Sequence, residues 1–237
     1  MNIAIIGYGK MGKAIEEILV ERGHQVPLKL NRKPEAEDLN QIDAAIEFSN
    51  PESAFENVQS LIKNNVPVIS GTTGWLDKLE EIRNLTQENN GAFLYGSNFS
   101  LGVNLFFELN EHLAKLMSQY PNYKIEMEEI HHTQKLDAPS GTAISLVEGI
   151  IKNSKKTGWV SEVTGNPELI PIRSIRTNQV PGTHSVAYIS EIDTIEIKHT
   201  AHSRKGFALG AVIAAEWIHG KKGIFSMKDV LGLNSGK

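Results

Sequence analysis

The sequence predicts an α/β protein with an N-terminal Rossmann-like, doubly wound parallel sheet and a following α+β domain. Three observations support this fold class. Apolar strand-like runs alternate with helix-like runs over the first hundred residues, which is typical of βαβ units. A glycine-rich turn joins the first strand to the first helix. After about Gly102 this alternation stops, and three strand patterns follow one another without a helix between them.

Each element of the first half follows from a local pattern. Short apolar runs predict strands at Ile3–Ile6, Val26–Leu30, Ile42–Phe48, Val66–Ser70 and Ala92–Tyr95. Apolar residues at helical spacing predict helices at Met11–Arg22, Pro51–Asn64 and about Asp77–Glu88. Pro51 suits the first turn of its helix, because that turn needs no N–H donor.

The second half begins with a long predicted helix, Val103–Met117, and a strand, Tyr123–Ile130. Another helix is expected at Gly141–Lys152. Short connections between the next strand patterns predict antiparallel sheet, with strands at Ile170–Arg176, Ser185–Ile189 and Thr194–His199. A helix at about Gly206–Trp217 and a tail at Phe225–Leu231 complete the chain.

Composition and charge exclude several classes of protein. The 237 residues suffice for one to two domains, at about 150 residues per domain. The 24 Lys+Arg and 28 Asp+Glu give a net charge of −4, without the basic stripe of a nucleic-acid-binding protein. The absence of cysteine excludes disulfides, thiolate metal sites and cysteine nucleophiles. With no signal-peptide pattern and no apolar run of ~20 residues, we expect a cytoplasmic protein without a membrane partner.

The glycine-rich turn has the context that a phosphate-binding loop needs. It reads Gly7-Tyr8-Gly9-Lys10-Met11-Gly12. The first glycine allows the tight turn, the second lets the backbone approach a pyrophosphate, and the third allows close helix packing. The helix start adds free N–H groups and the positive end of its dipole. A turn without a ligand is the alternative, but the flanking strand and helix favour a dinucleotide site.

Residues at the end of the second predicted strand distinguish the two nicotinamide cofactors. A carboxylate there binds the ribose hydroxyls of NADH, whereas arginine suits the 2′-phosphate of NADPH. Arg32 and Lys33 occupy this place, and no carboxylate occurs before Glu35. The sequence therefore predicts NADPH as the preferred cofactor and NADH as the second. Two solvated surface cations are the alternative interpretation.

Residues 129–143 gather proton donors beside a candidate anion site. His131 and His132 are adjacent, and Lys135 follows three residues later. A positioned histidine or lysine accelerates a proton transfer by roughly 10²–10⁴-fold. Adjacent histidines also occur by accident at surfaces, so this pattern needs a second feature.

That feature is the predicted helix start that follows. Ser140 is suited to be the N-cap, and the amides of Gly141 and Thr142 would lack intrahelical acceptors. Such a helix start readily binds a carboxylate. A cap without a ligand explains Ser140 equally well when it is considered alone. Together with the cofactor loop, however, the segment favours a substrate site.

These motifs resemble the 4-hydroxy-tetrahydrodipicolinate reductase family, also called dihydrodipicolinate reductases. Residues 129–143 are similar to the family signature throughout, and the resemblance covers nearly the whole chain. Further segments resemble the family's nicotinamide loops, later strands and tail: Gly71–Gly74, Ser97–Asn104, Arg176–His184, His199–Ala208 and Phe225–Leu231. Two departures are a glycine loop shorter by one residue than in many members, and Asn178 in place of the usual glycine.

The resemblance implies NAD(P)H-dependent reduction of 4-hydroxy-tetrahydrodipicolinate to tetrahydrodipicolinate, in diaminopimelate and lysine biosynthesis. The substrate is then a small heterocyclic dicarboxylate that accepts hydride and a proton. His131 and Lys135 are the implied catalytic residues, and which of them delivers the proton is left open. The implied substrate-binding residues are His132, Lys135, Ser140, Gly141 and Thr142.

The resemblance also implies the cofactor site, the domains and the assembly. The expected cofactor-binding residues are Gly7, Tyr8, Gly9, Lys10, Met11, Gly12, Arg32, Lys33, Gly71, Thr72, Thr73, Gly96, Ser97, Asn98 and Phe99. Residues 1–102 are expected to bind the dinucleotide, with about 213–237 packing back onto them. Residues 103–212 are expected to bind substrate and to form a homotetramer.

Three alternatives are distinguishable. Another NAD(P)-dependent imine or semialdehyde dehydrogenase would share the first domain but not the segment 131–135. A redox sensor would lack clustered proton donors and would typically carry a DNA-binding module. A metal site would use His131, His132, His199 or His202, but the lysine nearby and the absence of cysteine disfavour it.

Overall fold

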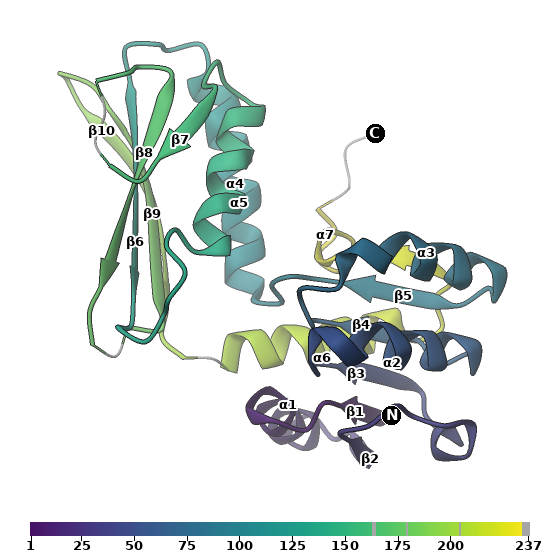
Figure 1. The fold of residues 1–237 in the computed structure, drawn as a ribbon. Coiled ribbons are helices and arrows are strands. Elements are labelled where there is room, and N and C mark those ends of the chain that lie inside the picture. Colours follow the sequence, from purple (N-terminus) through teal and green to yellow (C-terminus); the bar gives the residue numbers. More distant parts are fainter. Residues whose placement is uncertain (163–164, 179, 204, 234–237) are drawn as a thin grey trace. The chain divides into compact units, whose positions relative to one another are not determined.

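The computed structural model describes residues 1–162, 165–178, 180–203 and 205–233 (Figure 1). Arg204, within the family-like segment 199–208, lies outside them. The chain forms two compact units, one of Met1–Leu101 with Lys205–Lys237 and the other of Gly102–Arg204. No helix in the described part of the chain is both long and apolar enough to cross a membrane.

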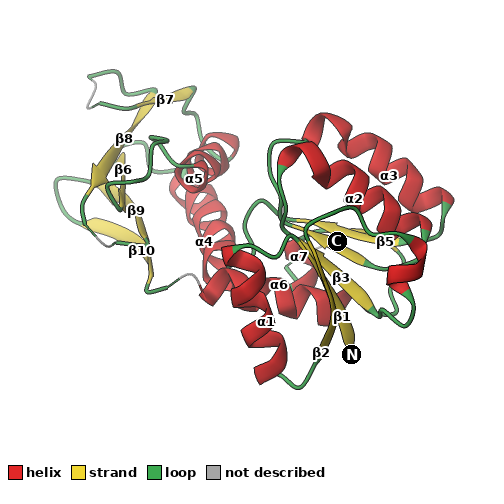
Figure 2. Ribbon diagram, turned by 60° about the horizontal axis from the view of Figure 1, so that its bottom comes forward, coloured by secondary structure: helices red, strands yellow, loops and turns green. Residues whose placement is uncertain are grey.

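The first unit is a six-stranded parallel sheet between two layers of helices (Figure 2). Its strands, in the spatial order β11-β5-β4-β3-β1-β2, are β11 (Gly223–Phe225), β5 (Ala92–Tyr95), β4 (Val68–Ser70), β3 (Ala44–Glu47), β1 (Asn2–Ile6) and β2 (Gln25–Leu30). Its helices are α1 (Lys10–Glu21), α2 (Pro51–Lys63), α3 (Leu79–Glu88), α6 (Lys205–Ile218) and α7 (Met227–Val230), with short 3₁₀ turns η1 (Ala36–Leu39) and η2 (Leu76–Lys78). The doubly wound prediction is confirmed.

Alternating residues of this sheet fill a core on each face. Ile3 and Ile5 pack with α1 and α6, whereas Ala4 and Ile6 pack with α2 and α3. The strand order reverses between β1 and β3, and ligands of such sheets bind at the carboxyl ends of the strands at this reversal. The glycine loop follows β1 directly at this edge.

Helix α6 belongs to the first unit along its whole length. The sequence predicts instead that the residues up to 212 belong to the second domain. The helix belongs to the first unit because Ala208, Ala211 and Val212 are fully buried in the core that contains Ile3 and Ile5. The return to the first unit therefore begins at Lys205.

The second unit is a five-stranded mixed sheet in the order β10-β9-β6-β8-β7. Its elements are α4 (Leu101–Met117), β6 (Lys124–His131), α5 (Gly141–Lys152), β7 (Gly158–Val160), β8 (Leu169–Arg176), β9 (Gly182–Ile189) and β10 (Thr194–Ala201). Helix α5 buries Leu146 and Val147 against one face of this sheet, and α4 buries Phe106 and Ala114 in the same core. Short strands β7 and β11 were not predicted.

The antiparallel prediction for residues 169–200 is wrong for one strand. Strand β8 pairs with β6 in parallel, and β7 pairs with β8 in parallel, whereas β9 and β10 are antiparallel as expected. The chain returns from β6 to the neighbouring β8 through α5, and a crossover of this kind produces parallel strands.

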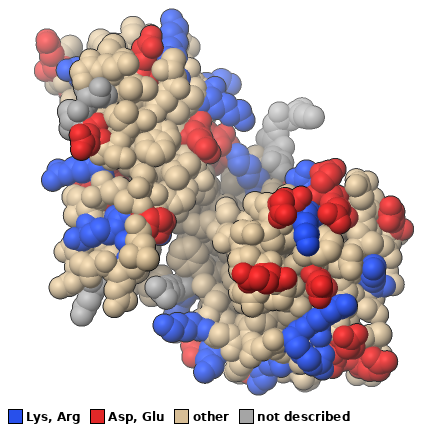
Figure 3. Space-filling model, in the orientation of Figure 1, with Lys and Arg blue, Asp and Glu red and all other residues tan. Residues whose placement is uncertain are grey.

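Residues of β6 alternate between the two faces of this sheet. Ile125, Met127, Glu129 and His131 are buried, whereas Lys124 and Glu126 are exposed. The buried face is thus apolar over its first half and polar near the start of α5. Figure 3 shows positive and negative side chains interspersed on the visible face of each unit.

Candidate active site

The glycine loop of the first unit has the shape that a pyrophosphate requires. Gly7 has φ +96°, and a Cβ there would lie 2.0 Å from the Phe48 carbonyl oxygen. A Cβ on Gly12 would lie 2.5 Å from the Gly7 oxygen. A Cβ on Gly9, by contrast, would meet nothing within 4 Å, so open space adjoins the start of α1. Gly7 and Gly12 therefore close the turn, and Gly9 leaves room for a ligand.

A pocket of about 220 Å³ adjoins this loop. Gly7, Gly9, Phe48 and Asn57 are among its lining residues. The Oδ1 atom of Asn57 is buried and has no hydrogen-bond partner within the described residues. An unpaired buried acceptor is costly, so a ligand hydroxyl or amide donating to it would be stabilised. These features fit a dinucleotide.

Glu47 organises the strand ends around this pocket. Its side chain is fully buried and accepts hydrogen bonds from Ser70 Oγ at 2.6 Å and Thr72 Oγ1 at 2.8 Å. It also accepts from the Ser49 amide at 2.9 Å. The ends of the neighbouring strands β3 and β4 are therefore joined through Glu47, which was not predicted as a site residue.

The other expected cofactor-binding residues differ in which of their groups a cofactor could reach. Gly71–Thr73 and Gly96–Phe99 follow β4 and β5, and so lie at the same sheet edge as the glycine loop. Thr72 uses its hydroxyl on Glu47, whereas Thr73 is exposed. The Phe99 ring is only 2% exposed and belongs to the hydrophobic core. Phe99 can therefore offer a cofactor only its backbone.

Arg32 is engaged in an ion pair that was not predicted from the sequence. Its Nη1 and Nη2 atoms donate to the two Asp38 carboxylate oxygens at 2.7 and 2.9 Å. Hydrogen bonding to Arg32 lowers the pKa of Asp38 to about 2, with help from the Glu35 amide. Lys33 is exposed. A 2′-phosphate of the cofactor would therefore either share the Arg32 guanidinium with Asp38 or displace the Asp38 carboxylate from it.

In the second unit, Glu129, His131 and His184 lie together and are buried. The His131 and His184 rings meet edge to face, with centroids 5.0 Å apart. His131 Nδ1 lies 3.5 Å from Glu129 Oε2, but within the described chain this nitrogen forms no hydrogen bond. Gly182 adjoins the other ring nitrogen, since a Cβ there would lie 3.2 Å from His131 Nε2.

The surroundings of His131 hold its ring neutral. Burial lowers the pKa of His131 to about 4, and the negative Glu129 only partly opposes this effect. His184, Lys135 and Arg176 lower it further. A doubly negative ligand beside the ring would favour its protonated form.

Acidification should therefore destabilise the protein through His131. The folded pKa of about 4 lies below the usual 6.5. As the pH falls between these values, the unfolded chain takes up a proton that the folded chain refuses, so stability is lost. We expect calorimetric melting temperatures to fall over this window, and to fall less in His131→Asn. Equal falls in the two proteins would contradict a buried neutral ring.

Lys135 lies in the loop between β6 and α5. Its Nζ atom donates to Asp137 Oδ2 at 2.9 Å, and the two side chains are 24% and 58% exposed. His132 is half-buried beside His131. The loop therefore offers an accessible cation next to the buried histidines.

Helix α5 begins beside this loop, as predicted. The Ser140 hydroxyl accepts from the Ala143 amide at 3.2 Å, and so caps the helix. Gly141 is exposed and Thr142 is half-buried. Because they are the first helical residues, their amides lack intrahelical acceptors and are directed toward a possible anion.

The structure brings together a different set of metal-type ligands from the one considered above. Within the part of the chain that is described, Glu129, His131 and His184 have ligand atoms within 4.8 Å of one another, and His132, His199 and His202 are not in this group. The Glu129 oxygens accept hydrogen bonds from Ser140, Ser174 and Arg176. A guanidinium 3.0 Å from the carboxylate opposes a second cation there. This arrangement favours a hydrogen-bonded cluster of side chains over a metal site.

Glu129, Arg176 and His184 were not predicted as site residues. Glu129 could have been found from strand parity, because it precedes His131 by two residues and therefore shares its face. Arg176 and His184 belong to other strands, so only the pairing of β6 with β8 and β9 reveals them.

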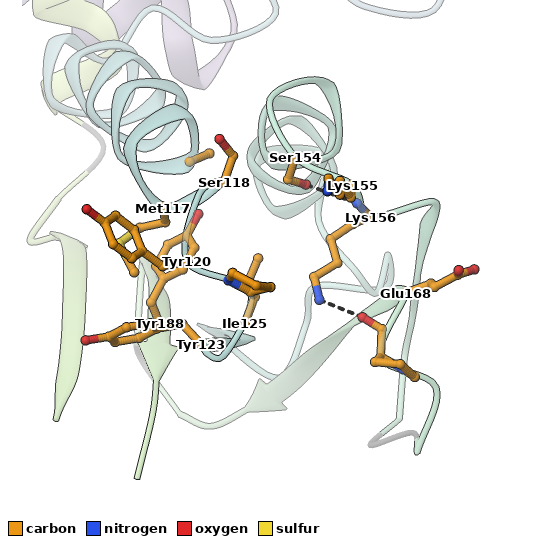
Figure 4. Close-up of a pocket in the computed structure, with 13 residues that line it drawn as sticks. Met117, Ser118, Tyr120, Tyr123, Ile125, Ser154, Lys155, Lys156, Glu168 and Tyr188 are labelled. Atoms are coloured by element: carbon orange, nitrogen blue, oxygen red, sulfur yellow. Dashed lines mark hydrogen bonds between the residues drawn. The ribbon is translucent and has the colours of Figure 1, made fainter. Parts of the chain in front are cut away.

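A second pocket, of about 260 Å³, lies elsewhere in the second unit (Figure 4). Met117, Tyr120, Ile125 and Tyr188 are among its lining residues, and it contains none of the predicted site residues. Burial raises the pKa of Tyr188 to about 12. This pocket is larger than the one at the glycine loop, but among the described residues no helix start lines it beside adjacent histidines, as in residues 131–142. The segment 131–142 therefore remains the candidate site for chemistry.

Two family models together match nearly the whole chain. A model named "Dihydrodipicolinate reductase, N-terminus" matches residues 1–99, and one named "Dihydrodipicolinate reductase, C-terminus" matches residues 102–231. The 4-hydroxy-tetrahydrodipicolinate reductase of Christiangramia forsetii is 54% identical over 234 residues, 98% of each chain. That of Neisseria meningitidis serogroup B is 36% identical over 205 residues, 83% of this chain and 75% of the relative.

Among solved structures, a dipicolinate-bound dihydrodipicolinate reductase from Paenisporosarcina sp. TG-14 superposes with a TM-score of 0.77. Its sequence is 24% identical, and the match covers 95% of this chain and 97% of that one. At this identity the likeness demonstrates a common fold.

Proposed function

We propose a division of roles among the residues of this chain from the premise that it belongs to the 4-hydroxy-tetrahydrodipicolinate reductase, or dihydrodipicolinate reductase, family. It is an NAD(P)H-dependent oxidoreductase that reduces 4-hydroxy-tetrahydrodipicolinate to tetrahydrodipicolinate in diaminopimelate and lysine biosynthesis. The observation that carries the assignment of roles is the grouping of His131, Lys135 and the Ser140-capped helix start within one short segment.

In this proposal, the second unit holds the dicarboxylate substrate. One carboxylate accepts hydrogen bonds from the Gly141 and Thr142 amides, where the helix dipole adds a favourable field. Lys135 exchanges its surface partner Asp137 for a substrate carboxylate. His132 contacts the substrate from the adjacent strand end.

Proton delivery is assigned to the His131–Lys135 pair. Lys135 carries an ammonium group on an accessible side chain, whereas His131 is buried and neutral without substrate. The two negative charges of the substrate favour protonation of the His131 ring. The protonated ring can then give this proton to the carbon that neighbours the reduced centre. The 4-hydroxyl, which the product lacks, leaves as water together with one proton of the substrate ring.

The glycine loop and the sheet edge of the first unit are proposed to hold the nicotinamide cofactor. The α1 amides face the pyrophosphate, and Asn57 Oδ1 accepts from a ligand donor in the pocket beside the loop. When bound, the reduced cofactor supplies the hydride.

A coupled assay with freshly generated heterocyclic substrate tests this function. We expect substrate-dependent oxidation of NADPH and NADH. Another imine or semialdehyde dehydrogenase would instead oxidise the cofactor with a panel of α-imino acids or semialdehydes. Activity with that panel alone would refute the assignment.

We further propose that NADPH is preferred through Arg32 and Lys33. Replacing both with alanine should raise the Kd for NADPH about tenfold or more, with a smaller change for NADH, because only NADPH carries the 2′-phosphate. Asp38→Asn is the matched opposite variant, since it releases Arg32 and should tighten NADPH selectively. Fluorescence titration measures both. Equal losses for the two cofactors in the double variant would contradict the assignment.

The second sheet is the proposed assembly surface for a homotetramer. Its face opposite α4 and α5 carries Glu126, Lys198 and Glu196, which are exposed. Sedimentation equilibrium should give four times the 26.2 kDa chain mass. A monomer at micromolar concentration would refute this assembly.

A further inference from the structure

We propose that Glu129 is a positioning residue for the reaction, whose buried carboxylate holds His131 and the start of α5 in one arrangement. This inference rests on the proposed roles of His131 and of the helix start. Glu129 is 0% exposed. Its Oε2 atom accepts from the Ser140 amide at 3.0 Å and lies 3.5 Å from His131 Nδ1. One oxygen therefore faces both parts of the site.

Sheet register builds this cluster. Glu129 pairs across the strands with Ser174 on β8 and with His184 on β9. Ser174 Oγ donates to Glu129 Oε1 at 2.8 Å, and His184 Nε2 lies 3.7 Å from Oε2. Two residues further along, His131 pairs with Arg176. Because these positions are set by strand pairing, they are rigid compared with a loop.

Arg176 extends the cluster to the loop that carries Lys135. Its Nη2 atom donates to Glu129 Oε1 at 3.0 Å and to the Asp137 carbonyl at 2.5 Å. Its Nε atom donates to the Lys135 carbonyl at 3.2 Å. A buried carboxylate needs such a cation. The same cation here fixes the loop backbone on both sides of Leu136.

Ser140 extends the cluster to the helix start. Its amide donates to Glu129, while its hydroxyl accepts from Ala143 and lies 3.1 Å from His184 Nε2. Loss of the Glu129 contact would therefore alter the residue that caps α5. The Gly141 and Thr142 amides, which follow directly, would lose their fixed direction.

Charge is the second contribution of Glu129. The charged or titratable groups that face His131 are Glu129 on β6, His184 on β9, Arg176 on β8 and Lys135 in the loop. Of these four, only Glu129 favours the protonated ring. Without this charge, His131 would take up a proton less readily at the step that needs one.

The full-length Glu129→Gln protein tests both contributions in the reductase assay. We expect kcat to fall by about tenfold or more, because misplacement by an ångström is costly in catalysis. We also expect the alkaline limb of the kcat–pH profile to move down by about 1 pH unit. Glu128→Gln is the matched control, since Glu128 lies on the opposite face, 3.6 Å from Arg173. This control should keep the wild-type profile.

The Glu129→Asp variant separates the effect of the negative charge from the effect of side-chain length. It keeps the charge, so its alkaline limb should stay near the wild-type position. Its shorter side chain cannot reach Ser140 and Arg176 together, so kcat should be intermediate. If Glu129→Gln fails to fold, this variant decides the question, and a wild-type kcat in Glu129→Asp would overturn the proposal.

Two results with Glu129→Gln would overturn it as well. One is an unchanged kcat, and the other is a lower kcat with the alkaline limb in its original place, which indicates a purely structural role. Failure of the proposed function is a separate result, because the wild-type protein would then be inactive in the same assay.

Discussion

Replacing Lys135 with alanine is expected to lower kcat by roughly 10²–10⁴-fold while changing the melting temperature by only a few degrees. The rate should fall because the proposed proton donor and carboxylate partner is lost. The fold should persist because the removed ion pair with Asp137 joins two partly exposed side chains. Such pairs contribute about 0–1 kcal/mol.

Lys152→Ala is the control for this variant. Lys152 is an exposed lysine at the end of α5, in the same unit. It should retain wild-type kcat. Steady-state kinetics and thermal melts of both variants provide the test. A Lys135→Ala protein with normal kcat, or one whose fold is lost, would count against the assignment.

Replacing Gly210 with alanine is expected to destabilise the first unit by more than about 3 kcal/mol, at the upper end of overpacking effects. A Cβ on Gly210 would lie 1.7 Å from the Phe99 carbonyl oxygen, and backbone cannot move aside cheaply. Helix α6 would have to separate from the Gly96–Phe99 loop that is proposed to contact the cofactor. Cofactor affinity should therefore decline together with the melting temperature.

Gly206→Ala is the matched control on the same helix. A Cβ there would have its nearest neighbour, Ser100 Oγ, at 3.7 Å, which is ordinary contact. Alanine also favours helix over glycine by about 1 kcal/mol. Gly206→Ala should therefore melt at or above the wild-type temperature. A Gly210→Ala protein as stable as Gly206→Ala would show that the close approach of α6 to Phe99 is wrong.

The pattern of the first half could be predicted from sequence because its signals are local. The strand before Gly7, the glycines of the loop and Pro51 at the start of α2 each belong to one short segment. The strands β7 and β11 were missed because each begins with glycine and has only two apolar residues, whereas β4, of equal length, continues an apolar run from Val66. Their strand geometry depends on neighbours that are distant in sequence.

In the candidate site, too, local features could be predicted from the sequence, whereas contacts between distant segments could not. Ser140, Gly141 and Thr142 form a helix start that could be predicted from three consecutive residues. The parallel pairing of β6 with β8 could not be predicted, because nothing in residues 169–176 specifies the neighbouring strand. The Arg32–Asp38 pair was missed for a similar reason, since it depends on the turn η1 bringing Asp38 back to the strand end.

The most direct test of the central claim is a crystal structure of the protein with NADP⁺ and pyridine-2,6-dicarboxylate. We expect one ligand carboxylate on the amides of Gly141 and Thr142, with Lys135 Nζ within hydrogen-bond distance of the ligand and the His131 ring facing it. A dicarboxylate bound elsewhere, with residues 131–142 free of ligand, would contradict the proposed substrate site.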